Sequence, residues 1–179
     1  VDGGISFFEV ALNSEHGLKQ IAILRDHFGE KCMIGAGTAI SVDLAKAAIG
    51  AGAQFLLTPG TPIDVLQYCA KKDIMLLPGV FTPGDVATSL EFGYKTMKLF
   101  PAGCAPKGYL KALKGPYDEA NYIAIGGVTI DNINDYFKEG YMGVGLSSNL
   151  MPLSVLKDKN WDLGVSYVQK YVSRVKRRV

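Results

Sequence analysis

The sequence has few cysteines, few histidines and no long apolar run. Its three cysteines, Cys32, Cys69 and Cys104, are far apart and odd in number, which is typical of reduced thiols in a cytoplasmic protein. Neither His16 nor His27 has partners at metal-ligand spacing, so we expect no metal site. No apolar stretch approaches the roughly 20 residues that cross a bilayer, and no signal-peptide pattern opens the chain. We therefore expect a cytoplasmic protein that does not bind a membrane.

Net charge is also low, because 19 lysines and arginines stand against 17 aspartates and glutamates. This balance argues against a dedicated nucleic-acid binder. Basic residues gather only near the C-terminus, where we interpret them as the solvated end of a last helix: Lys170, Arg174, Lys176, Arg177 and Arg178. With 179 residues and 48% hydrophobic content, the chain suits one globular domain. We expect that domain over residues 1–179, with a helical extension over 153–179 that packs on it.

Short apolar runs alternate with longer amphipathic ones along the chain. The pattern predicts seven strands: Ile5–Leu12, Cys32–Ala36, Gln54–Leu57, Ile74–Leu77, Thr96–Phe100, Tyr122–Ile125 and Met142–Leu146. It predicts helices between and after them: Glu15–Phe28, Val42–Ala51, Pro62–Lys71, Pro83–Phe92, Lys107–Leu113, Ile130–Glu139 and Asp162–Lys176. Thr61 and Thr82, each followed by proline, are expected to cap two of these helices.

Regular alternation of strands and helices predicts a parallel sheet, because parallel neighbours need crossover connections. An open doubly wound sheet and a closed (β/α)₈ barrel both satisfy it. The stretch Val1–Gly4 resembles the tail of a helix, and seven strands are one short of a barrel. We therefore expect a barrel to lack its first β-α unit here. Residues 1–179 alone are expected to be unstable, since an open barrel exposes strand edges.

Lys98 lies near the end of a predicted core strand, between Met97 and Leu99. Burial of an unpaired ammonium group is costly, so we expect the pKa of Lys98 to be lowered. The resulting neutral amine is a nucleophile that can form a Schiff base with a carbonyl substrate. The alternative is a side chain that reaches from the strand end into solvent.

Further polar residues and glycines stand where other strands end or face inward. Glu9 alternates with Phe8 and Val10, so we expect it to point into a barrel, as a general acid and base or as a structural partner of an interior lysine. Thr38 offers a hydroxyl at the mouth after the second strand. The glycine pair 126–127 and the loop 145–149 follow the last two strands, where (β/α)₈ barrels commonly bind phosphate.

Several segments, in this order, resemble the class I aldolases that cleave 2-keto-3-deoxy-6-phosphogluconate (KDPG) and 4-hydroxy-2-oxoglutarate (KHG). The matching segments run from residue 1 to about residue 152 and are Phe8-Glu9-Val10, Ile34-Gly35-Ala36-Gly37-Thr38, Thr58-Pro59-Gly60, Leu77-Pro78-Gly79-Val80, Lys98-Leu99-Phe100-Pro101-Ala102, Ile125-Gly126-Gly127-Val128, and Ser148 before Met151-Pro152.

The resemblance implies a (β/α)₈ TIM barrel, a homotrimer and catalysis without a metal or a separate cofactor. Lys98 would form the Schiff base with a phosphorylated keto acid, and Glu9 would carry protons. The products would be pyruvate and an aldehyde, glyceraldehyde 3-phosphate for the phosphorylated substrate. The remaining positions implied to bind substrate are Thr38, Asn13, Pro59, Phe100, Gly126, Gly127 and Ser148.

Three positions depart from the resemblance. Asn13 stands where an arginine often binds the substrate carboxylate, and asparagine supplies neither charge nor a guanidinium fork. Ile125 replaces a frequent serine or threonine before the glycine pair, and Gly103 replaces a frequent glutamate. These changes leave the amine and the carboxylate in place and affect substrate preference.

Three alternatives remain open from the sequence. The substrate could be unphosphorylated 4-hydroxy-2-oxoglutarate. A phosphosugar isomerase or epimerase on the same type of barrel could use Glu9 without an electrophilic lysine. A non-catalytic phosphosugar-binding protein would bind the ligand and turn nothing over.

Overall fold

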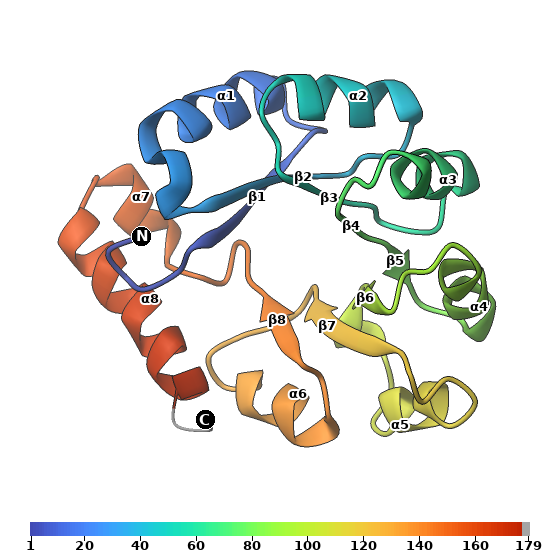
Figure 1. Ribbon diagram of the computed structural model, residues 1–179. Helices are drawn as coiled ribbons and strands as arrows, with labels where there is room; N and C mark the ends of the chain where they lie inside the picture. Colours follow the sequence, from blue (N-terminus) through green and yellow to red (C-terminus); the bar gives the residue numbers. More distant parts are fainter. Residues whose placement is uncertain (177–179) are drawn as a thin grey trace.

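The computed structural model describes residues 1–176, which form a ring of parallel strands surrounded by helices (Figure 1). Its strands are β1 (Phe7–Ala11), β2 (Met33–Gly37), β3 (Phe55–Leu57), β4 (Leu76–Leu77), β5 (Gly79–Val80), β6 (Thr96–Leu99), β7 (Asn121–Ile125) and β8 (Gly143–Gly145). Its helices are α1 (Gly17–Phe28), α2 (Val42–Gly50), α3 (Ile63–Lys71), α4 (Pro83–Glu91), α5 (Tyr109–Lys114), α6 (Ile133–Glu139), α7 (Leu153–Lys157) and α8 (Trp161–Lys176), with 3₁₀ turns at Gly29–Lys31 and Ala102–Cys104. Arg177 and Arg178 of the terminal basic cluster lie outside the described residues.

All strand pairings are parallel, and they form two four-stranded sheets in the orders β1-β2-β3-β4 and β5-β6-β7-β8. The sheets meet at Pro78, which separates β4 from β5 and has no N–H for a ladder hydrogen bond. The Pro78 carbonyl still accepts a hydrogen bond from the N–H of Lys98 at 2.8 Å, so the ring continues past the break. Among the described residues β1 pairs only with β2, and β8 only with β7.

The predicted α/β class with parallel strands is therefore confirmed, and the ring is open between β1 and β8. The sequence pattern missed β5, because a two-residue strand is too short to show periodicity. The helix α7 was also not predicted as a separate element. No helix within residues 1–176 is both long and apolar enough to cross a bilayer.

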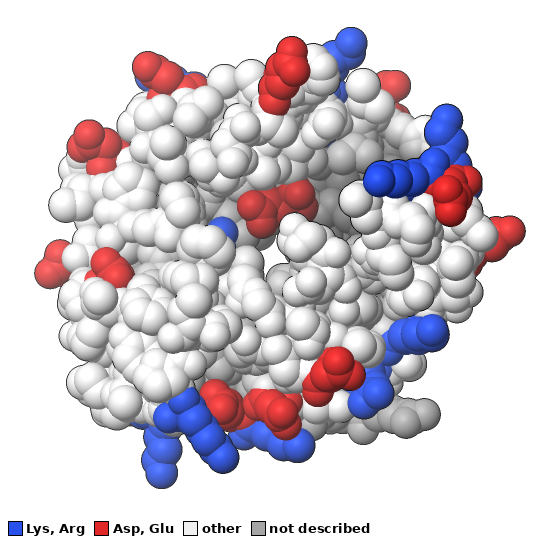
Figure 2. Space-filling model, turned by 180° about the vertical axis from the view of Figure 1, so that it is seen from behind, with Lys and Arg blue, Asp and Glu red and all other residues white. Residues whose placement is uncertain are grey.

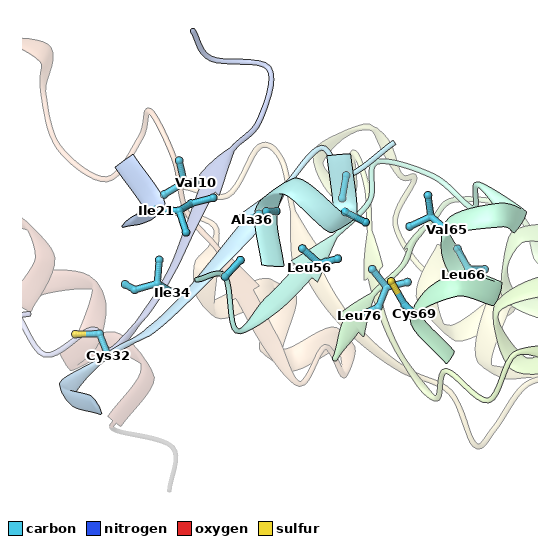
Figure 3. Close-up of a cluster of buried hydrophobic side chains, with 14 residues drawn as sticks. Val10, Ile21, Cys32, Ile34, Ala36, Leu56, Val65, Leu66, Cys69 and Leu76 are labelled. Atoms are coloured by element: carbon cyan, nitrogen blue, oxygen red, sulfur yellow. The ribbon is translucent and has the colours of Figure 1, made fainter. Parts of the chain in front are cut away.

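Alternation along the strands divides the side chains between an outer, helix-covered layer and the interior of the ring. The first buried cluster joins β1–β4 to α1–α3 and includes Val10, Ile34 and Leu56 (Figure 3). A second cluster joins β5–β8 to the helices outside them and includes Met97 and Leu99. Each sheet thus has its own apolar core on its outer side.

Glycines on the inner face of the ring leave room for large side chains from neighbouring strands. A β-carbon on Gly35 would overlap the ring of Phe55, and one on Gly37 would overlap the carboxylate of Glu9. On the other sheet, a β-carbon on Gly145 would lie 2.8 Å from the side chain of Ile125. Inside the ring, a large side chain on one strand therefore lies against a glycine on the neighbouring strand.

The starts of α3 and α6 differ from their predictions, whereas the start of α4 agrees. Thr82 caps α4 as expected, in a reciprocal capping box with Asp85. Thr61 does not cap α3: its hydroxyl lies 3.3 Å from a carboxylate oxygen of Asp85, and α3 begins at Ile63 after Pro62. The competing carboxylate comes from another helix, so local sequence could not reveal it. The helix α6 begins at Ile133, after a turn over residues 130–132, and not directly beside the glycine pair.

Candidate active site

Lys98 occupies the middle of the ring wall. Its neighbours Met97 and Leu99 point into the outer core, so alternation directs Lys98 to the inner face. The predicted burial is confirmed, because only 6% of the residue is exposed. Burial lowers the pKa of Lys98 from its ordinary value of 10.5, and the negative charge of Glu9 opposes part of that shift. A lowered pKa favours the neutral form of an amine, which is its nucleophilic form.

Glu9 projects from β1 on the other sheet. Phe8 and Val10 pack into the first core, and Glu9 alternates with them toward the inner face. The side chain is exposed. Figure 2 shows the molecule hollowed near its centre, with acidic and basic atoms at the wall of the hollow. A solvent-connected carboxylate can exchange protons with water as well as with a substrate.

The amine and the carboxylate are coupled without being locked together. Within residues 1–176 neither Lys98 nor Glu9 takes part in an ion pair of 4.0 Å or less. The strands beside β6 place Gly79 and Ile123 opposite Lys98, and neither carries charge. Within the part of the chain that the structure describes, Glu9 is the charged group that acts on the amine, from more than 4.0 Å away.

The exits of β2 and β3 contain two threonines with different roles. Thr38, at the mouth after β2, has a backbone φ of 62°, a left-handed conformation that is uncommon for a residue other than glycine. Strain of this kind concentrates at functional sites. Thr58 was noted in the sequence only as part of a turn. It is fully buried, and its hydroxyl donates to the Gly60 carbonyl at 2.6 Å and accepts from the Gly79 N–H at 3.1 Å.

Thr58 therefore fixes the exit of β3 against β5, the strand beside Lys98. Pro59 follows it and is exposed, and its backbone lies against Gly79 so closely that no side chain fits there. The signal that could have identified Thr58 is a hydroxyl residue immediately before a proline–glycine turn at a strand end.

The loops after β6 and β7 pack on each other at Phe100 and the glycine pair. The amine nitrogen of Lys98 lies 4.6 Å from the ring centroid of Phe100. A β-carbon on Gly126 would lie 3.2 Å from that ring, and the carbonyl of Gly126 accepts a hydrogen bond from the Gly103 N–H at 2.8 Å. Gly126 and Gly127 both have positive φ values, 89° and 84°, which a glycine adopts without strain.

Asn149 was not predicted and connects the last two loops. Its side-chain amide donates a hydrogen bond to the Val128 carbonyl at 3.1 Å, and its backbone carbonyl accepts one from the Tyr171 hydroxyl at 2.6 Å. This holds the loop with Ser148 beside the loop with the glycine pair, as the predicted phosphate position requires. No sequence pattern marks Asn149, because its partner lies 21 residues away.

The structure brings predicted residues together in two groups, which the charge of Glu9 on Lys98 connects. Lys98 contacts Phe100, Phe100 contacts Gly126, and Glu9 lies over Gly37, next to Thr38. Asn13 and Ser148 are exposed in the loops after β1 and β8. A buried amine under the charge of a carboxylate, within a ring of parallel strands, would suit a lyase that works through a Schiff base.

Comparison with known proteins agrees with this class. The sequence model described as "KDPG and KHG aldolase" matches residues 1–166. The chain belongs to this family of carbon–carbon lyases. It is 31% identical to 2-dehydro-3-deoxy-6-phosphogalactonate aldolase of Escherichia coli K12, over 96% of this chain and 84% of the relative. It is 33% identical to 2-dehydro-3-deoxy-phosphogluconate aldolase of Pseudomonas aeruginosa PAO1, over 89% and 72%.

A solved structure shows the same fold with its chemistry in progress. It is the KDPG aldolase of Legionella pneumophila with pyruvate captured at low pH as a covalent carbinolamine intermediate. That structure superposes with a TM-score of 0.87 at 30% identity, over 94% of this chain and 82% of the other.

Proposed function

We propose that this protein is a class I aldolase that cleaves a 2-keto-3-deoxy-6-phospho-sugar acid into pyruvate and glyceraldehyde 3-phosphate. The observation that carries the proposal is the burial of Lys98, with its lowered pKa, opposite Glu9. The neutral amine adds to the keto carbon, and the carbinolamine loses water to give an iminium ion. Glu9 supplies and removes the protons in this step.

Cleavage then follows from the electron demand of the iminium. Glu9 takes the proton from the C4 hydroxyl, the C3–C4 bond breaks, and its electron pair moves to the nitrogen as an enamine while the aldehyde departs. Protonation at C3 and addition of water release pyruvate and restore the amine. No metal or separate cofactor takes part in this sequence of steps.

Substrate contacts are assigned to the loops around the hollow. Thr38, Pro59 and Phe100 surround the keto-acid portion, and Asn13 donates a hydrogen bond to its carboxylate. The backbone N–H groups of Gly126 and Gly127, with the Ser148 hydroxyl, hold the phosphate. The hydrogen bond between Asn149 and Val128 supports this last assignment, because it joins the two loops. We place the reaction in the cytoplasm, which three free cysteines support.

The decisive experiment is borohydride reduction in the presence of pyruvate, followed by peptide mass mapping. We expect one stable adduct, on Lys98, and none in the Lys98→Ala variant. Lys95→Ala is the matched control: Lys95 is exposed and pairs with Glu119 at 2.8 Å, so its loss should leave trapping unchanged. Substantial turnover by Lys98→Ala would indicate an isomerase or epimerase, and phosphosugar binding without turnover would indicate a binding protein.

A second substrate, 4-hydroxy-2-oxoglutarate, is favoured by Ile125. This apolar side chain stands on the inner face of β7, directly before the glycine pair, where a hydroxyl could otherwise contact a phosphate. Cleavage rates for the two substrates, measured side by side, separate the possibilities. We expect the phosphorylated substrate to be cleaved faster.

We further propose that the chain assembles as a homotrimer. A groove of about 490 Å³ between the starts of α2 and α3 contains none of the proposed site residues. It is lined by Ile40 and Ile63, which are 54% and 60% exposed, and apolar surface of this kind suits contact between subunits. Sedimentation equilibrium should give three times the 19.3 kDa chain mass. Ile40→Glu combined with Ile63→Glu should give monomers.

A further inference from the structure

Phe100 lies with its ring beside the amine of Lys98, and the separation from nitrogen to ring centroid is 4.6 Å. Lys98 lies in β6 and Phe100 directly follows the last residue of that strand, Leu99. A cation within about 6 Å of an aromatic face is attracted by the negative charge of that face. This interaction strengthens when the cation is removed from water, and Lys98 is buried.

The position of the ring is fixed by the loop after β7. A β-carbon on Gly126 would lie 3.2 Å from the Cδ2 and Cε2 atoms of Phe100, so only glycine lets the ring and the loop pack this closely. The Gly126 carbonyl is held in turn by the Gly103 N–H. The ring thus has the backbone of Gly126 on one side and the Lys98 amine nearby.

We propose that the face of Phe100 stabilises positive charge on the Lys98 nitrogen, in the ammonium form and then in the iminium formed with the keto acid. This inference rests on the proposed aldolase function and adds an electronic role for Phe100. Burial disfavours positive charge on this nitrogen, and the charge of Glu9 offsets that effect only in part. Glu9 on β1 is the charged group that acts on it, while the adjacent positions on β5 and β7 are Gly79 and Ile123.

An aromatic face suits this task better than a second carboxylate. It favours the cation without accepting its proton and without neutralising it, so the iminium keeps its demand for electrons. A carboxylate at the same place would raise the proportion of unreactive ammonium more than the aromatic face does, because a full negative charge attracts the cation more strongly.

The test is a series of fluorinated phenylalanines at position 100, with one, two and three fluorines. Fluorine weakens the negative face of the ring and changes its volume little. The readout is the pH midpoint of pyruvate trapping on Lys98 with cyanoborohydride. We expect the midpoint to fall stepwise, by about one pH unit across the series, because the ammonium loses support. The same series at Phe92, which packs on the first core cluster, should leave the midpoint unchanged.

Two substitutions by standard amino acids provide an independent check should a fluorinated variant fail to fold. Phe100→Tyr keeps an aromatic face and should keep the wild-type midpoint, whereas Phe100→Leu should shift it downward. A midpoint that does not change with fluorination, or that is equal in the Tyr and Leu variants, overturns the role of Phe100. Absence of trapping in the wild-type protein would instead reject the aldolase function itself.

Discussion

The carboxylate of Glu9 occupies the space that a side chain at Gly37 would need. Glu9 is paired across β1 and β2 with Gly35, and Gly37 is the next inner position along β2. The glutamate side chain therefore extends along the strand direction, toward the end of β2 that leads to Thr38. Because Gly37 on β2 has no β-carbon, the carboxylate of Glu9, the proposed proton carrier on β1, can lie at this position.

Gly37→Ala is expected to displace the Glu9 carboxylate and to lower kcat by about 100-fold, the usual effect of misplacing a catalytic group by about 1 Å. Trapping of pyruvate on Lys98 should persist, since the amine lies on the other sheet. Turnover and trapping measured on the same preparation give the comparison. Gly50→Ala, at the end of α2, has no atom within 4 Å of the new β-carbon and should keep full activity. Equal kcat values for both variants would show that Glu9 is not placed by Gly37.

Lys98→Met is expected to abolish turnover and to increase the free energy of unfolding by about 1–3 kcal/mol. Methionine has a similar length and no charge to bury, and removal of a buried ion in favour of an apolar side chain is often stabilising. Denaturant unfolding near neutral pH measures the gain. A variant less stable than the wild type would indicate that the amine makes stabilising contacts that outweigh its burial.

The stability gain of Lys98→Met should depend on pH in a defined direction. Because the pKa of Lys98 is lowered in the folded protein, the unfolded chain binds the proton more tightly. Wild-type stability therefore rises with pH from the folded pKa up to about 10.5, and the advantage of the methionine variant shrinks over that interval. Lys95→Met is the opposite control. The hydrogen bond and charge of Glu119 raise the pKa of Lys95, so any stability from that pair is lost at high pH.

Asn149→Ala should loosen the loop after β8 from the loop after β7. Loss of the hydrogen bond to the Val128 carbonyl costs about 1 kcal/mol and should raise KM for the phosphorylated substrate about fivefold. The KM for 4-hydroxy-2-oxoglutarate, which has no phosphate, should not change. Asn160 stands directly before α8, and its side-chain oxygen accepts a hydrogen bond from the Leu163 N–H. Asn160→Ala removes this bond and serves as the control. An equal effect on both substrates would contradict the phosphate assignment.

Asn13→Arg should strengthen binding of the substrate carboxylate. Asn13 is exposed two residues beyond β1, and a guanidinium there adds charge and a bidentate donor. We expect KM to fall about tenfold for both substrates, with a change in unfolding free energy within about 0.5 kcal/mol. Steady-state kinetics at two salt concentrations would detect the added charge. Unchanged KM values would place the carboxylate elsewhere.

The sequence was sufficient for features that depend on local pattern. The apolar neighbours Met97 and Leu99 predicted a buried lysine, and alternation along the first strand predicted the direction of Glu9. Helix bounds agree within a few residues where apolar spacing and a local cap coincide, as at Thr82.

Features that depend on contacts between distant segments were not predictable. Thr61 is drawn to a carboxylate 24 residues away, and Asn149 to a carbonyl 21 residues away. The exposure of Glu9 depends on how the strands are arranged around it, which no single strand encodes. Strand β5 follows from the interruption at Pro78, where two residues resume the pairing.

The division of the ring at Pro78 has a mechanical consequence. Glu9 belongs to the sheet β1–β4 and Lys98 to the sheet β5–β8, and each sheet is anchored in a separate apolar core. The proposed reacting pair is therefore held by two cores that one unbroken backbone joins, because Pro78 connects β4 directly to β5 and its carbonyl accepts a hydrogen bond from the Lys98 N–H. A substitution that alters the packing of either core would move one partner of the pair relative to the other.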